Sequence, residues 1–129
     1  MSDAANFYSD YLLIKYDTFG DTIWTRTYNG SAGLADEVTV MEIDEANNIY
    51  ITGKSQGTGT GFDIVTIKYN PDGVQQWVAV FNGDADDDDI PYDMTFDQAG
   101  NLYVVGSSYY QSNSTYTDGV LIKYSPEGT

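Results

Sequence analysis

The chain of 129 residues contains no cysteine and no histidine. The absence of Cys excludes disulfides, thiolate metal sites and Cys nucleophiles, and it leaves the redox compartment undetermined. The absence of His excludes Ser-His-Asp triads and zinc hydrolase sites, because His is the commonest general base near neutral pH and the commonest transition-metal ligand. Any catalytic site in this chain must therefore rely on carboxylates and tyrosines.

Basic residues are also scarce. Five Lys and Arg stand against 20 Asp and Glu, which gives a formal net charge of −15. This charge repels nucleic-acid phosphates and anionic lipid surfaces, so we expect no nucleic-acid partner. No apolar run reaches membrane-spanning length, and Met1 to Asp10 lacks the basic start and apolar stretch of a signal peptide. We expect no membrane insertion, and the residues themselves do not determine the localisation.

The sequence does contain ample apolar material and an internal repeat. Hydrophobic residues make up 41% and aromatics 15% of the chain, which is typical of a globular protein. The segment DYLLIKY (Asp10 to Tyr16) aligns with DIVTIKY (Asp63 to Tyr69), and the register holds without a gap through NIYITG and NLYVVG. A third copy, DGVLIKY, begins at Asp118 after a two-residue insertion. A period of this size indicates a repeat architecture.

Each repeat carries four strand signals rich in β-branched and aromatic residues. In the first copy they are Tyr11 to Asp17, Thr22 to Tyr28, Val38 to Asp44 and Asn48 to Gly53. Tight turns such as NPDG, SPEG and DEANN separate them, and no window shows the apolar period of a helix. A four-stranded antiparallel unit of about fifty residues matches a β-propeller blade, whereas the coils of a strand solenoid, the weaker alternative, are usually shorter. The prediction is an all-β fold with about two four-stranded blades per chain.

The same strings resemble a known family. The order DYLLIKYD, GDTIW, YNG, and then DIVTIKYNPDGVQQW, FNG, FDQAGNLYVVG is similar to the SBBP β-propeller repeat of bacterial proteins. The resemblance covers nearly the whole chain. It implies a propeller fold and occurrence in large secreted or cell-surface proteins, and it implies no reaction.

Val38 to Asp44 and Tyr92 to Asp97 resemble the strand nearest the axis in such propellers, which we label strand A. The strands of a blade are labelled A to D from the axis outward. The chain is then a single propeller segment with strands C-D over 1–30, a complete blade A-B-C-D over 36–83 and strands A-B-C over 89–129.

A closed propeller needs about four to eight blades, so a chain with two exposes blade faces and strand edges. Either the chain is a piece of a longer tandem protein, or one copy's outer strands complete another copy's blade. We expect the second, with about three or four copies in a cyclic homo-oligomer, because closed symmetry favours it. Strand C then occurs twice at the junction, and either copy can occupy it. The junction residues are Tyr11, Ile14, Tyr16, Val120, Ile122 and Tyr124.

The loop GDADDDDIP offers a candidate calcium site at Asp84, Asp86 and Asp88, since Ca²⁺ takes six to eight oxygen ligands. The EF-hand spacing fails, because Asp89 stands where Gly is needed and Thr95 where the bidentate Glu belongs. The alternative is a solvated acidic loop. We expect no required cofactor, with calcium as the one candidate.

The loops KSQGTGTGF and SSYYQSNSTYT join strand B to strand C, on the same side of the ring as the acidic loop. Tyr109, Tyr110 and Tyr116 lie among Ser and Asn, a composition that suits recognition of glycans or proteins. The alternative is ordinary polar loop composition.

Two further residue types recur at the repeat period. Trp24 and Trp77 coincide, which favours core packing between adjacent blades over a ligand platform. Lys15, Lys68 and Lys123 coincide as well, and we expect a regular structural salt bridge with a neighbouring acid.

Three functions are compatible with these observations. The first is a non-catalytic, self-assembling structural scaffold. The alternative is a binding module for glycans or proteins that uses the Tyr-, Ser- and Asp-rich loop face. A carboxylate glycosidase comes third, because nothing selects one pair among the 20 acids.

Overall fold

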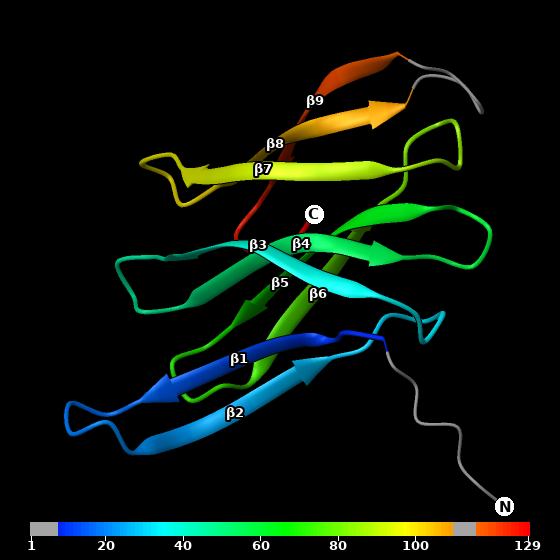
Figure 1. Cartoon of the computed structure of the whole chain (residues 1–129). Coiled ribbons are helices and arrows are strands. Elements are labelled where there is room, and N and C mark those ends of the chain that lie inside the picture. The colour runs from blue at the N-terminus through cyan, green and yellow to red at the C-terminus, as the bar shows by residue number, and fades with distance from the viewer. Residues whose placement is uncertain (1–7, 110–115) are drawn as a thin grey trace, which may run out of the picture.

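The computed structural model describes residues 8–109 and 116–129. These residues form strands, turns and loops without a helix, so the all-β prediction is confirmed (Figure 1). Across the two described ranges, no helix is long and apolar enough to cross a membrane. The nine strands are β1 (Tyr11–Tyr16), β2 (Thr22–Tyr28), β3 (Asp36–Ile43), β4 (Ile49–Gln56), β5 (Phe62–Tyr69), β6 (Gln75–Phe81), β7 (Asp89–Phe96), β8 (Leu102–Tyr109) and β9 (Thr117–Tyr124).

The strands form three antiparallel sheets in chain order: β1-β2, β3-β4-β5-β6 and β7-β8-β9. We call them the first, central and third sheets. Strands β3 and β4 are longer than the sequence predicts, since β3 begins at Asp36 and β4 runs to Gln56. The extension of β4 follows from its pairing with β5, which continues from Ile49↔Tyr69 to Gln56↔Phe62.

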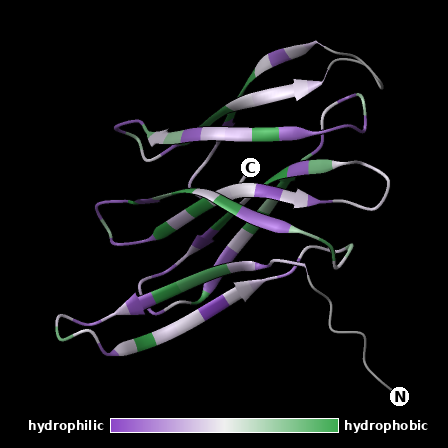
Figure 2. Ribbon diagram, in the orientation of Figure 1, coloured by the Kyte–Doolittle hydropathy of each residue, from purple (hydrophilic) through white to green (hydrophobic). Residues whose placement is uncertain are grey.

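The three sheets stack face to face, with the central sheet in the middle (Figure 1). Strands β4 and β5 of the central sheet are buried along almost their whole length, and Figure 2 shows apolar residues along both. One apolar cluster joins the first and central sheets, and a second joins the central and third sheets. We call these contacts the first junction and the second junction. Stacking therefore gives each sheet the core that it lacks alone.

The hairpins β3-β4 and β7-β8 share one polar arrangement. Asp44 accepts hydrogen bonds from the backbone of Ala46 and Asn48, from the Asn48 amide at 2.9 Å and from the Tyr50 hydroxyl at 3.1 Å. Burial alone raises the pKa of Asp44, but these hydrogen bonds outweigh it and hold the pKa below its ordinary value. Asp97 makes the equivalent bonds in the second hairpin, and its pKa is lowered chiefly by the amide of Asn101.

A repeated clamp closes the outer half of each junction. At the first, Lys15 Nζ and Trp24 Nε1 both donate to the Pro71 carbonyl, at 2.8 and 3.3 Å. At the second, Lys68 Nζ and Trp77 Nε1 donate to the carbonyl of Pro126, at 2.9 and 3.0 Å. The packing role predicted for the tryptophans is confirmed.

The salt bridges predicted for Lys15 and Lys68 are wrong, since both ammonium groups bind a turn carbonyl of the next sheet. Lys123 instead lies over the Tyr103 ring, 5.4 Å from its centroid. Within residues 8–109 and 116–129, the ion pair is Lys54 with Glu37, at 3.3 Å.

The clamp requires glycine in the turn that accepts it. Gly73 and Gly128 have φ angles of 79° and 87°, a region that favours glycine. A Cβ at Gly73 would lie 2.8 Å from the Trp24 ring, and one at Gly128 would lie 2.6 Å from the Trp77 ring. Each Pro-X-Gly turn therefore packs its backbone directly against a tryptophan of the preceding sheet.

Candidate functional site

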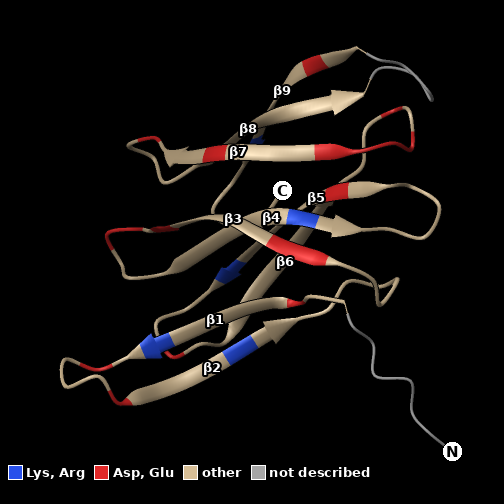
Figure 3. Ribbon diagram, in the orientation of Figure 1, with Lys and Arg blue, Asp and Glu red and all other residues tan. Residues whose placement is uncertain are grey.

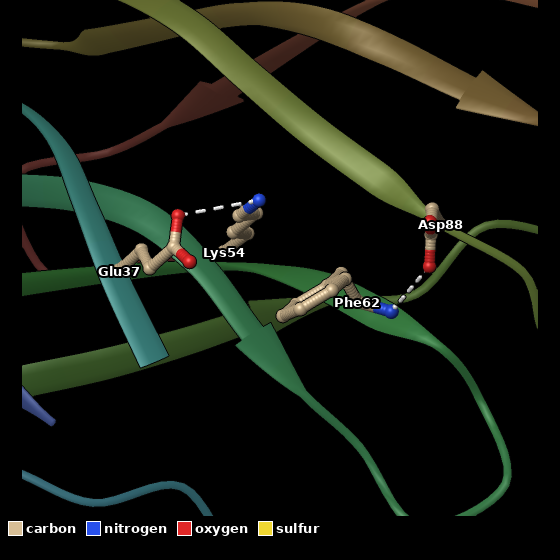
Figure 4. Close-up of polar contacts among 4 residues, drawn as sticks. All are labelled: Glu37, Lys54, Phe62 and Asp88. Carbon is tan, nitrogen blue, oxygen red and sulfur yellow. Dashed lines mark hydrogen bonds and ion pairs between the residues drawn. The ribbon is translucent and has the colours of Figure 1, made fainter. Parts of the chain in front are cut away.

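The loops that carry the predicted binding residues gather at one end of the sheets. The connections 29–35 and 82–88 between sheets and the loop 57–61 between β4 and β5 lie at the same end, as predicted (Figure 1). The backbone N–H of Phe62 donates to Asp88 Oδ1 at 3.0 Å and joins two of these loops (Figure 4). Figure 3 shows acidic residues concentrated in the loop between β6 and β7.

The carboxylates of the acidic loop have different contacts. Asp86 Oδ1 accepts from the Asn82 amide at 2.7 Å, and Asp88 accepts from Phe62. Asp84 lines a neighbouring hollow. In the part of the chain that the structure describes, no group of three acidic side chains is placed to hold a metal ion. Calcium binding by Asp84, Asp86 and Asp88 stays a prediction.

Three buried aspartates lie beneath this loop end. Asp36 and Asp89 are each 1% exposed, and their Oδ2 atoms accept from the backbone N–H of Gly30 and Gly83, at 2.9 and 2.7 Å. These contacts fix the turn before β3 and the turn before β7. The coincidence of Asp36 and Asp89 in the repeat indicated this turn-capping role, although both residues begin strands.

Asp63 is the residue that sequence reasoning missed. It is buried at the start of β5, and its Oδ2 accepts from the Thr60 hydroxyl at 2.9 Å. Its Oδ1 has no hydrogen-bond partner among the described residues. Burial, joined by the charges of Asp89 and Asp86, raises the pKa of Asp63 above its ordinary value despite the bond from Thr60. The repeat position gave no signal, because the equivalent Asp10 is exposed.

Tyr109 lies beside an open hollow of about 330 Å³, which we call the loop-end hollow. Asn82, Asp84, Ser108 and Asp118 also line it. Tyr109 is the last residue of β8 rather than a loop residue, because its pairing with Thr117 extends the strand. Tyr116 is exposed, directly before β9. Tyr110 lies outside the described residues.

The repeat that forms this end of the molecule is a known one. Residues 76–109, from β6 to the end of β8, match the family described as SBBP, a beta-propeller repeat. The chain carries an SBBP propeller repeat. No curated protein matches the sequence. The resemblance seen in the sequence is therefore confirmed for the segment in which one sheet passes to the next.

The repeat period also shows which apolar side chains are exposed in one sheet and buried in the next. Leu12, Ile14 and Tyr16 lie on the outward face of the first sheet and are 57%, 36% and 56% exposed. Their repeat equivalents in the central sheet, Val65, Ile67 and Tyr69, are 1%, 0% and 3% exposed. The outward face of the first sheet is thus exposed, whereas the equivalent face of the central sheet is covered by the first sheet.

The other predicted junction residues have different surroundings. Tyr11 is buried against the central sheet of its own chain, where its hydroxyl donates to the Val65 carbonyl at 3.3 Å. A role for Tyr11 at a subunit junction stays a prediction. Val120, Ile122 and Tyr124 of β9 face the central sheet in the second cluster.

A groove of about 400 Å³ lies between the first and central sheets. Leu13, Tyr16, Met41, Ile43 and Ile49 are among its lining residues, and we call it the inner groove. In the described residues β1 pairs with β2 alone, and the other edge of β1 borders this groove. Met41 and Ile43 are 49% and 51% exposed there.

Proposed function

We propose that the chain is a non-catalytic structural module whose copies join head to tail into a closed β-propeller ring of about three or four chains. The proposal involves no cofactor. The observation that carries it is the contrast in exposure between Leu12, Ile14 and Tyr16 and their buried equivalents Val65, Ile67 and Tyr69.

Exposed apolar groups of this kind mark association surfaces. The outward face of the first sheet also includes Ile23, which is exposed. The inner groove adds Met41 and Ile43 beside it. Several exposed apolar side chains on one face are typical of a surface that another sheet covers, and burying the exposed part of each contributes about 1 kcal/mol.

Charge sets the conditions under which copies associate. The net charge of −15 makes copies repel one another. Screening by salt weakens this repulsion, while apolar burial is unaffected or strengthened. We therefore expect assembly to increase with ionic strength.

The test is the mass of the 129-residue chain in solution, measured by light scattering after size exclusion and by native mass spectrometry. The expected result is a discrete species of three or four chains. A folded monomer at micromolar concentration in physiological salt contradicts the proposal.

A matched pair of variants assigns the surface. Ile14→Glu places a charge on the outward face of the first sheet and is expected to give monomers. Phe19→Glu is the control, because Phe19 is exposed and its repeat equivalent is Glu127, so assembly should be retained. Equal masses for the two variants would show that this face is not the interface.

The loop-end hollow favours a second candidate function, recognition of a glycan or protein. It combines the Tyr109 ring with Asp84, Asp118, Ser108 and the Asn82 amide, which supply a flat apolar surface and hydrogen-bonding groups together. The test is a glycan array probed with the chain and with Tyr109→Ala. Loss of a signal in the variant supports recognition, and an array without any signal removes glycans as the ligand.

A further inference from the structure

The strands β1 and β9 are near copies of one another that occupy different places. YLLIKY of β1 aligns with GVLIKY of β9, from Gly119 to Tyr124. We propose, resting on the proposed ring, that β1 and β2 of a second copy replace β9 beside β8. The blade at each subunit junction is then β7-β8 of one copy followed by β1-β2 of the next.

The pairing register permits this exchange without a shift. In the chain, β8 pairs with β9 through Val104↔Ile122 and Leu102↔Tyr124. The equivalent partners after exchange are Ile14 and Tyr16 of the second copy. Both replacements keep the side chain the same, so the ladder with β8 keeps its length and its direction.

The exchange also buries the face that the first sheet leaves open. Val120, Ile122 and Tyr124 of β9 now pack against the central sheet, beside Tyr50 and Trp77. Their sequence equivalents in β1 are Leu12, Ile14 and Tyr16, which are the exposed residues of the outward face. The incoming strand therefore offers the same or a larger apolar side chain at each position.

Strand β2 of the second copy then supplies the fourth strand, which the third sheet lacks in the described residues. The turn between β1 and β2 also has the geometry that the clamp needs. Gly20 has a φ of 89°, like Gly73 and Gly128, but nothing among the described residues lies within 4 Å of a Cβ placed there. The turn at Gly20 thus resembles the turn at Gly128, which packs against Trp77, but no tryptophan among the described residues packs against it.

In this arrangement, β7 and β8 of one copy fill the inner groove of the second copy and complete its first junction. At the second junction, Tyr50 of strand β4 packs on Phe96, with ring centroids 4.8 Å apart, and Met94 is 3% exposed. The equivalent of Tyr50 is Tyr103, while the equivalents of Met94 and Phe96 are the exposed Met41 and Ile43. One position departs from the pattern, since Asp93 stands where the central sheet has Val40.

Two double cysteine variants distinguish the two placements in the full chain, which has no cysteine of its own. Ser108 pairs with Asp118 in the chain, and its partner after exchange is Asp10 of the second copy. Paired strand residues lie about 4.5–5.5 Å apart at Cα, within disulfide reach. Asp10 and Asp118 are both exposed, so each tolerates substitution. The variants are Asp10→Cys with Ser108→Cys, and Ser108→Cys with Asp118→Cys.

The expected result, in mildly oxidising conditions, is that the Asp10→Cys/Ser108→Cys variant forms covalent dimers and larger closed species on a non-reducing gel. Asp10 directly precedes β1 of the first sheet and Ser108 lies in β8 of the third sheet. These two sheets lie on opposite sides of the central sheet, so this bond has to join two chains (Figure 1). The Asp10→Cys and Ser108→Cys single variants control for random collision.

A second outcome overturns the exchange but not the ring. If the chains assemble while only Ser108→Cys/Asp118→Cys crosslinks, within one chain, then β9 remains in place. If the unmodified chain is monomeric, the proposed ring itself fails, and the exchange fails with it.

Discussion

The two junctions of this molecule use the same outer contacts but differ in their inner half. Both are clamped by a lysine and a tryptophan that donate to a proline carbonyl, Pro71 at the first junction and Pro126 at the second. At the second junction, strands β3 and β4 cover the inner strands of the third sheet. At the first junction, within residues 8–109 and 116–129, only β1 and β2 face the central sheet. Met94 is consequently 3% exposed and its equivalent Met41 is 49% exposed.

This difference shows that the two halves of a junction are separable. The clamp and the apolar cluster around Leu13 and Ile67 hold a two-stranded sheet in the stacked orientation without its inner strands. The inner half of the first junction is therefore more open than that of the second, where Met94 is buried.

Replacement of the two tryptophans should give the largest difference in stability between the two junctions. Trp77→Ala should destabilise the chain by about 3 kcal/mol, because Trp77 packs with Tyr50 and Tyr124 at 6.0 and 5.7 Å between ring centroids. Trp24→Ala should cost less, about 2 kcal/mol, because among the described residues no strand equivalent to β4 packs beside Trp24. Urea unfolding of both variants checks the order, and equal losses would mean that the inner strands add nothing to the clamp.

Replacing the glycine of each β1-β2-type turn by alanine distinguishes the cost of backbone strain from the cost of a clash with the tryptophan. Gly20→Ala should cost about 1 kcal/mol, the penalty for a left-handed φ alone. Gly73→Ala and Gly128→Ala should cost about 2–3 kcal/mol, because the added Cβ also meets Trp24 or Trp77. The three variants are compared by urea unfolding of dilute, unassembled protein. A loss at Gly20 as large as at Gly73 would remove the contact as the cause.

A smaller, pH-dependent effect on stability distinguishes the buried Asp63 from its exposed equivalent Asp10. Asp63→Asn should stabilise the chain by about 1 kcal/mol at pH 7, because it removes a buried charge whose Oδ1 has no partner among the described residues. Folding raises the pKa of Asp63. The destabilisation of the wild-type chain by the ionised carboxyl therefore grows as the pH rises from the unfolded pKa of about 4 through the folded pKa. Below about pH 4 the two proteins should melt together.

The control for this variant is Asp10→Asn at the exposed equivalent position, which should leave the melting temperature unchanged. Melting curves between pH 3 and pH 8 test both variants. Stabilisation by Asp10→Asn as well would point to the net charge of the chain rather than to burial.

The smallest effect concerns the hairpins β3-β4 and β7-β8. Asp44→Asn and Asp97→Asn should each destabilise the chain at neutral pH, because the folded pKa of either carboxyl lies below its unfolded value. That stability is present above about pH 4 and is lost as the pH falls through the folded pKa. The effect should be larger at Asp44, since its partner Tyr50 is buried at the second junction. Acid titration followed by circular dichroism measures the two shifts.

Much of the fold was predictable because the repeat supplies independent copies of each signal. The register that superposes Trp24 on Trp77 and Asp36 on Asp89 indicates which residues perform a repeated structural task. Four strand signals and tight turns per unit then predict the blade. The acceptor of the lysines was not predictable, because a backbone carbonyl carries no mark in the sequence.

The candidate site was predictable only in outline. The acidic loop and Tyr109 lie at the same end of the molecule, as expected, but the burial of Asp63 depends on how loops 57–61 and 82–88 fold over it. Its equivalent Asp10 occupies the same repeat position and is exposed. Burial that arises from one local loop contact leaves no periodic signal.

The clamp has a consequence for how such proteins change over generations. Its acceptor is a main-chain carbonyl, which every residue type possesses, so proline is not essential to the bond itself. The donor lysine and tryptophan and the turn glycine are the residues that must be kept, and each full repeat contains all three. A duplicated or transplanted repeat therefore arrives able to attach to its new neighbour, which makes gain and loss of blades an accessible route of evolutionary change.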